Sequence, residues 1–176
     1  MDENERLKLL ATMASGPEML LNVLNGVSEE TAARNPAEGR WSILDCVEHL
    51  ALAENYLLSQ ILAGQTTDAP PGSSEREARI LARGSDRTRT VFAPDVAIPH
   101  SKFATIGEAL KAFLTVRERT IEFVENCHEN LRLKTTTHPI IGPANCYEML
   151  LMISIHPHRH ANQIAEIRNI LDGNPD

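Results

Sequence analysis

Two histidines, His156 and His160, lie four residues apart on the apolar face of a predicted C-terminal helix. Each helical residue turns by about 100°, so residues three, four and seven apart share one face. By the same count, His158 points to roughly the opposite side. The residues predicted to face inward are Met149, Ile153, His156, His160, Gln163, Ile164, Ile167 and Leu171. Two imidazoles and an amide therefore interrupt an otherwise apolar face.

The two inward histidines need a common explanation, because burying a neutral imidazole without a partner costs on the order of 1–3 kcal/mol. A divalent cation explains both, since histidines at i and i+4 bind one metal from a single helix. The H-E-x-x-H pattern uses this spacing, but no glutamate lies between these two histidines. The sequence thus predicts a metal site whose third ligand comes from another element.

His49 is the best candidate for the third ligand, because it is the one other histidine that lies well inside a long predicted helix. It lies on the flank of an apolar face, and flank positions in a helix bundle reach the central axis. That face consists of Ile43, Val47, Leu50, Leu57 and Ile61. For His100 and His138, in loops beside prolines, and His128, near a helix end, solvent or a capping interaction is sufficient.

Glu54 projects from the centre of the same apolar face, where an unpaired carboxylate is costly. Two explanations fit the sequence. In the first, the buried acid pairs with an inward arginine such as Arg117, or with Tyr56. In the second, Glu54 orients a ligand imidazole or acts as a general base for a metal-bound nucleophile. Gln163, one turn beyond His160, fits a similar orienting role.

Helical patterns dominate the chain and no segment shows convincing strand alternation, so we predict an all-α protein with four long helices. Pairs of capping residues mark where three of them begin: Ser42 with Asp45, Thr105 with Glu108, and Asn145 with Glu148. The long helices are predicted to run from Glu3 to Asn25, from Ser42 to Gly64, from Thr105 to Cys127 and from Asn145 to Gly173. A short helix is predicted from Ser28 to Arg34.

The sequence also predicts some features of the segments that connect the helices. Residues 65–104 form a predicted crossover that wraps the bundle and contains an amphipathic segment at about 75–89. Residues 134–143 are predicted to form a turn-rich link, and Gly16-Pro17 is predicted to bend or restart the first helix.

Pro157 lies inside the last predicted helix, where it removes a backbone hydrogen bond and crowds the preceding turn. We therefore expect a kink beside the histidines. Two explanations remain open: a tolerated bend, or a device in which the bend or the freed carbonyl near Ile153 shapes the site.

The chain has 176 residues, enough for a proper core, and we predict one domain over residues 1–176. A net charge of −7 and the absence of a basic face argue against nucleic acid as a partner. The longest apolar run, 149–155, is too short to span a bilayer, and the acidic start is unlike a signal peptide. We therefore expect a cytoplasmic protein without a membrane partner. Cys46, Cys127 and Cys146 are distant, which indicates reduced, buried thiols.

The segment WSILDCVEHL at 41–50, followed by Glu54, resembles the W-S…H-L…E signature of the DinB/YfiT-like superfamily. The C-terminal part is similar as well, because HPIIGP at 138–143 precedes a long apolar helix. This helix carries residues matching the family's H-x-x-R-H-x-x-Q pattern: His156, Arg159, His160 and Gln163. The resemblance extends over nearly the whole chain.

This resemblance implies an antiparallel four-helix bundle with a long crossover connection. It also implies a divalent metal bound by His49, His156 and His160. Pro157 stands where relatives often carry a polar residue, although the spacing of the histidines is unchanged. Some relatives are thiol-dependent transferases or isomerases, and the family name does not imply DNA binding.

Three neutral imidazoles leave coordination positions open on zinc or nickel, the metals we expect here. Our first hypothesis is a thiol S-transferase acting on a small-molecule substrate. In this reaction the metal lowers the pKa of a bound water or low-molecular-weight thiol cosubstrate, and Glu54 assists proton transfer. Two alternatives stay open: a metal-dependent hydrolase, and a non-catalytic module in which the metal stabilises a binding or dimerisation surface. A homodimer fits a bundle of this size.

Overall fold

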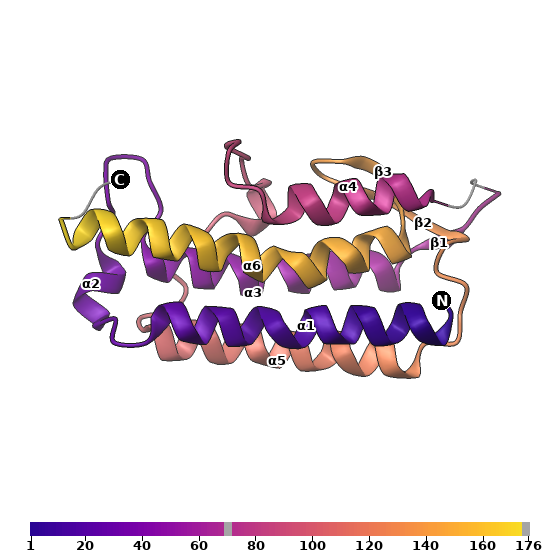
Figure 1. Cartoon of the computed structure of the whole chain (residues 1–176), viewed down its shortest axis with the longest axis horizontal. Helices are drawn as coiled ribbons and strands as arrows, with labels where there is room; N and C mark the ends of the chain where they lie inside the picture. Colours follow the sequence, from indigo (N-terminus) through magenta and orange to yellow (C-terminus); the bar gives the residue numbers. More distant parts are fainter. Residues whose placement is uncertain (69–71, 174–176) are drawn as a thin grey trace.

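The computed structural model describes residues 1–68 and 72–173; residues 69–71 of the predicted crossover and 174–176 at the end of the predicted domain lie outside the described residues. Four long helices run along the long axis of the molecule (Figure 1). They are α1 (Glu3–Leu24), α3 (Ile43–Leu62), α5 (Ile106–Asn126) and α6 (Cys146–Leu171). The predicted four-helix bundle with a long crossover is confirmed.

The crossover lies between α3 and α5 and contains α4 (Ser74–Ser85) and one turn of 3-10 helix, η1 (Asp95–Ala97). α4 packs along α6 on the outside of the bundle (Figure 1). η1 packs against α3. Because the crossover returns the chain to its starting end, α3 and α5 run in one direction and α1 and α6 in the other (Figure 1). A short helix, α2 (Glu29–Ala33), joins α1 to α3.

A small antiparallel sheet closes one end of the bundle, with strand order β1-β2-β3. Its strands are β1 (Gln65–Thr66), β2 (Lys134–His138) and β3 (Gly142–Asn145). The prediction of a turn-rich link without strands is therefore wrong. The three threonines at 135–137 are β-branched and favour a strand, and Gly142 takes a φ of 73° beyond the reversal. His138 ends β2 opposite Gly142, so the hairpin fixes its position.

Side chains cap the N-termini of α3 and α6, the two helices that carry the three histidines. At α3, Ser42 accepts a hydrogen bond from the N–H of Asp45 and the Asp45 carboxylate accepts one from Ser42, as predicted. The same reciprocal pair, Asn145 and Glu148, begins α6. These caps satisfy N–H groups that a helix leaves free at its start, and so fix where each helix begins.

At α5 the predicted cap is only half formed. Thr105 accepts a hydrogen bond from the N–H of Glu108, but the Glu108 carboxylate accepts one from Ala104 instead of Thr105. The N–H of Ile106 donates instead to Glu29 of α2, which ties the start of α5 to the short helix.

Neither proline interrupts its helix. α1 continues through Gly16 and Pro17 without a restart, and α6 continues through Pro157. The two sites meet, because a Cβ placed on Gly16 would lie 3.0 Å from the Cβ of Pro157. Glycine at position 16 thus allows α1 to approach the proline of α6 closely.

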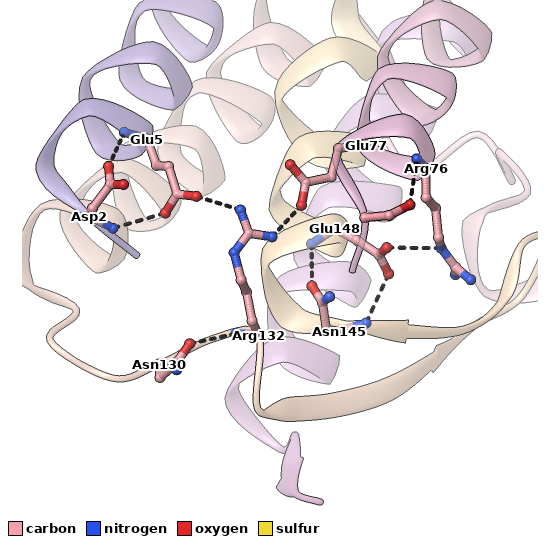
Figure 2. Close-up of polar contacts among 9 residues, drawn as sticks. Asp2, Glu5, Arg76, Glu77, Asn130, Arg132, Asn145 and Glu148 are labelled. Atoms are coloured by element: carbon pink, nitrogen blue, oxygen red, sulfur yellow. Dashed lines mark hydrogen bonds and ion pairs between the residues drawn. The ribbon is translucent and has the colours of Figure 1, made fainter. Parts of the chain in front are cut away.

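Ion pairs join the sheet end of the bundle (Figure 2). The guanidinium of Arg132, just before β2, contacts both Glu5 of α1 and Glu77 of α4. Arg76 of α4 lies 2.9 Å from Glu148, the capping residue of α6. Figure 2 shows these side chains arranged around the start of α6, so α1, α4 and the hairpin together hold the end from which α6 begins.

The hydrophobic core is divided into two clusters of buried side chains. On each of the four long helices, residues near one end belong to the first cluster and residues near the other end belong to the second. The residues between them include Gly16 of α1, Glu54 of α3, Arg117 and Thr120 of α5, and His156 and His160 of α6. A layer containing ionisable groups therefore crosses the middle of the bundle.

Cys46, Cys127 and Cys146 are buried and free of disulfides, as predicted. None of the helices within the described residues combines the length and hydropathy needed to cross a membrane.

Candidate metal centre

The structure brings together the three histidines selected from the sequence. Nε2 of His156 lies 3.3 Å from Nε2 of His49 on α3 and 2.9 Å from Nε2 of His160 one turn later on α6. Their candidate ligand atoms all lie within 4.8 Å of one another. Three nitrogen donors from two helices thus converge on one point.

His49 is held in the orientation that a ligand needs. Its Nδ1 lies 2.7 Å from the carbonyl oxygen of Ala97 in η1. A carbonyl only accepts hydrogen bonds, so Nδ1 carries the proton and Nε2 has a free lone pair. Hydrogen bonds of this kind commonly set the tautomer of metal-binding histidines.

The spacing of the nitrogens fits a divalent cation. The neutral His156 ring has at most one N–H at Nε2, so it cannot donate to both neighbours at once. A cation attracts all three lone pairs together. Two nitrogens bound to one metal at about 2.0–2.1 Å, at angles between about 90° and 109°, lie roughly 2.9–3.4 Å apart. The distances from His156 to His160 and to His49, 2.9 and 3.3 Å, agree with this arrangement, and the pair His49 and His160 lies within 4.8 Å.

Burial keeps the three imidazoles neutral, which is the form that binds a metal. It lowers the pKa of His49 to about 4, against the weaker opposing effect of the Ala97 hydrogen bond. It also lowers the pKa values of His156 and His160 well below the usual 6.5, with further lowering by the neighbouring histidines. Nδ1 of His160 is buried and has no hydrogen-bond partner among the described residues.

A pocket of about 300 Å³ opens beside the three histidines. Its walls come from α3, α6, residues 87–97 of the crossover and the β2-β3 hairpin. The indole of Trp41 packs against the imidazole of His49, with ring centres 4.8 Å apart. Other apolar lining residues are Tyr56, Leu57, Phe92, Ile140 and Met152. The size and mixed lining are typical of small-molecule sites.

A model of the DinB superfamily matches residues 13–164. The chain belongs to the DinB superfamily. Two solved structures share the fold of this DinB protein at low sequence identity. TT2238, described as a four-helix bundle protein, is 17% identical over 91% of this chain and 98% of its own, with a TM-score of 0.59. No curated protein matches the sequence.

The second solved structure is YfiT from Bacillus subtilis, which is 14% identical and has a TM-score of 0.62. The match covers 96% of this chain and 89% of YfiT. YfiT is described as a probable metal-dependent hydrolase with an unusual four-helix bundle topology. At these identities both neighbours show the shared fold alone, and they agree with the resemblance found in the sequence.

Glu54 does not line the pocket of this DinB protein. Its carboxylate accepts hydrogen bonds from Arg117 at 2.7 Å and from the hydroxyl of Thr120 at 2.8 Å, both on α5. The first sequence explanation, pairing with Arg117, is therefore confirmed. Burial raises the pKa of the Glu54 carboxyl to about 7, opposed by Arg117 and Thr120. Its predicted role in proton transfer stays a prediction.

The carbonyl that Pro157 leaves without an intrahelical donor has a partner. Arg117 Nη2, which binds Glu54, also donates to the carbonyl oxygen of Ile153 at 3.1 Å. Ile153 stands four residues before Pro157, where the missing N–H would otherwise bind. The proline therefore frees a carbonyl on α6 that Arg117 of α5 binds, about one turn from His156 and about two turns from His160.

The remaining histidines divide into two groups. His158 faces away from the site, as predicted, with Nε2 3.0 Å from the hydroxyl of Ser15, and His100 and His128 are exposed. His138 differs from the prediction, because it is buried and lines the pocket. Its Nδ1 accepts hydrogen bonds from the N–H groups that follow, so part of the predicted capping role is correct.

Sequence reasoning also missed Arg159 as a pocket residue, although it belongs to the quoted family pattern. The signal was its position between His156 and His160, which places it at the edge of their face. Gln163 was selected from the sequence and does line the pocket, but its side-chain oxygen lies 3.4 Å from Arg87 of the crossover.

Proposed function

We propose that this DinB protein is a divalent-metal-dependent enzyme that acts on a small molecule in the pocket beside His49, His156 and His160. The observation that carries the proposal is the convergence of three neutral imidazole nitrogens at the wall of a pocket of about 300 Å³. Zinc or nickel suits an all-nitrogen donor set. Bound there, the cation supplies the Lewis acidity that lowers the pKa of an incoming nucleophile.

The protein's own residues supply orientation and exclusion of water. The Ala97 carbonyl fixes the His49 ring, and Trp41 packs against it with the ring planes tilted by 45°. Glu54 and Arg117 join α3 to α5 and α6 at the level of the ligands, so we assign them a positioning role. The alternative role of Glu54 as a base would require its carboxylate, which is bonded to Arg117 and Thr120 and does not line the pocket, to exchange a proton with the pocket.

Two nucleophiles fit the site. The first is a low-molecular-weight thiol cosubstrate. In a thiol S-transferase reaction it would lose its proton and form a carbon–sulfur bond to an electrophilic substrate, while the bond from that carbon to the leaving group breaks. The second is water, in a hydrolase reaction, which the description of YfiT as a probable metal-dependent hydrolase favours. Dependence of turnover on added thiol separates the two.

The metal is tested first. Metal content is measured by mass spectrometry on untagged wild-type protein, the double variant His156→Ala/His160→Ala and the control His158→Ala. His158 lies on the same helix but faces Ser15, away from the site. We expect near-stoichiometric metal in the wild type and the control, and loss in the double variant. Equal metal in all three, or none after reloading, contradicts the proposal.

Activity is then measured on the metal-loaded protein with a panel of thiols and electrophiles, and with ester and amide substrates in the absence of thiol. Turnover that requires thiol supports the transferase, and turnover without thiol supports the hydrolase. Stable metal binding with no turnover on any panel supports the non-catalytic binding module instead.

A further inference from the structure

Basic side chains gather in the lining of the pocket although the chain carries a net charge of −7. Four arginines line it, and no aspartate or glutamate does so within residues 1–68 and 72–173. They are Arg40, Arg87, Arg89 and Arg159. A pocket wall with one sign of charge concentrates ligands of the opposite sign.

Arg159 is the unusual member of this group. It lies on α6 between His156 and His160 and is only 8% exposed. In the part of the chain that the structure describes, its hydrogen-bond partner is the backbone carbonyl of Arg89, at 2.8 Å, and no carboxylate forms an ion pair with it. Asp86 and Glu166 act on this guanidinium only at longer range, so its donors are not used up by a direct ion pair and can serve a ligand in the pocket.

Arg87 shows how an arginine of this wall is satisfied when an acid is present. Its Nε and Nη2 donate to the two carboxylate oxygens of Glu166 at 3.2 and 2.8 Å, and its Nη1 donates to Gln163. Arg159 has the same fork of donors and lacks the carboxylate. Arg40 and Arg89 lie at exposed positions of the wall.

We propose that Arg159, assisted by Arg89 and Arg40, forms an anion subsite beside the three imidazoles, and that the substrate of this pocket carries a carboxylate or phosphate group. A planar guanidinium binds both kinds of oxyanion through paired N–H donors. The exposed ring of Phe92, together with Ile140, favours a substrate whose other part is apolar. This inference rests on the proposed function, since it names the substrate class of the same pocket.

The test is a binding titration of metal-free protein with inorganic phosphate and, separately, with hexanoate, followed by ¹H–¹⁵N chemical shifts. The variants are Arg159→Gln, Arg159→Lys and the control Arg79→Gln, which removes an exposed charge from the outer side of α4. We expect the dissociation constant of the wild type to rise by about tenfold or more in Arg159→Gln, because charge-assisted contacts are the strong kind. The control should match the wild type, and Arg159→Lys should fall between the two.

Binding of phosphate alone assigns a phosphate group, binding of hexanoate alone assigns a carboxylate with an apolar tail, and binding of both assigns a general oxyanion subsite. Absence of binding to the wild type overturns the inference. Equal affinity in wild type and Arg159→Gln also overturns it. If Arg159→Gln does not fold, Arg89→Gln replaces it, because only the backbone of Arg89 is bonded to Arg159, and an unchanged affinity there overturns the inference as well.

The titration also separates this inference from the proposed function. It is made without metal, so a protein that fails to bind zinc or nickel refutes the enzyme proposal and leaves the anion result standing. A different result is that anions bind only to the metal-loaded protein, and bind equally well to the wild type and Arg159→Gln. The metal then holds the anion, which refutes the anion subsite and leaves the enzyme proposal standing.

Discussion

His138 is predicted to make the protein sensitive to mild acid. The side chain is 4% exposed, and its Nδ1 accepts hydrogen bonds from the N–H groups of Ile140 and Ile141 at 3.1 and 3.3 Å. Burial lowers its pKa from 6.5 to about 4. Because the folded pKa lies below the unfolded one, the unfolded chain takes up the proton first as pH falls. The stability linked to His138 is therefore present above pH 6.5 and is lost between pH 6.5 and 4.

The magnitude follows from the two pKa values. At 1.36 kcal/mol per pKa unit, the linked free energy of unfolding is about 3 kcal/mol, of which about 2.5 kcal/mol is lost at pH 4.5. This is a large share of a typical total of 5–15 kcal/mol. The variant His138→Asn keeps an acceptor oxygen close to the position of Nδ1 and removes the titration.

The assay is urea unfolding of metal-free protein at pH 7.5 and pH 4.5, followed by circular dichroism. Between these two values the wild type should lose about 2.5 kcal/mol more than His138→Asn, since every other titrating group is shared. His128→Asn is the matched control, because His128 is exposed, and it should behave as the wild type. Equal losses in the wild type and His138→Asn would refute the argument that burial holds this imidazole neutral.

Three further outcomes are expected. Gly84→Ala should destabilise the fold by about 1–3 kcal/mol in urea unfolding, because the added Cβ overlaps the Ile155 side chain of α6; an unchanged midpoint would show that α4 is free to move away. Arg117→Met should cost about 3–5 kcal/mol by leaving Glu54 buried and unpaired, and the loss should shrink when Glu54→Leu is added. Chelation of a catalytic metal should abolish turnover with a small fall in Tm, whereas a large fall indicates a structural ion.

The three imidazoles were predictable because their positions depend on local rules. Helical periodicity placed His156 and His160 on one inward face, and the Ser42 cap fixed the start of the helix that carries His49. The four-helix architecture followed from the same periodicity together with the family pattern. Helical periodicity and capping residues depend on only a few neighbouring residues, so they can be recognised without knowledge of the tertiary structure.

The pocket wall was not predictable in the same way. Arg89, Phe92 and His138 reach the site from the crossover and from a hairpin whose strands are too short to show alternation. Their proximity to α6 depends on contacts between segments distant in sequence. Pro157 shows the limit of prediction from sequence. Its position shows that the Ile153 carbonyl is freed, but the arginine that binds this carbonyl comes from another helix.

Two buried arginines of this bundle differ in their hydrogen-bond partners and therefore in the role that we assign to them. Arg117 is 2% exposed and has a carboxylate and a carbonyl supplied by the fold, so its charge is balanced without any ligand. Arg159 is nearly as buried, but its partner is a single neutral carbonyl, and it lies on the wall of the pocket beside the imidazoles. Arg159 makes no direct ion pair within the described residues, so its guanidinium keeps donors available for an anionic ligand in the pocket, as the proposed anion subsite requires.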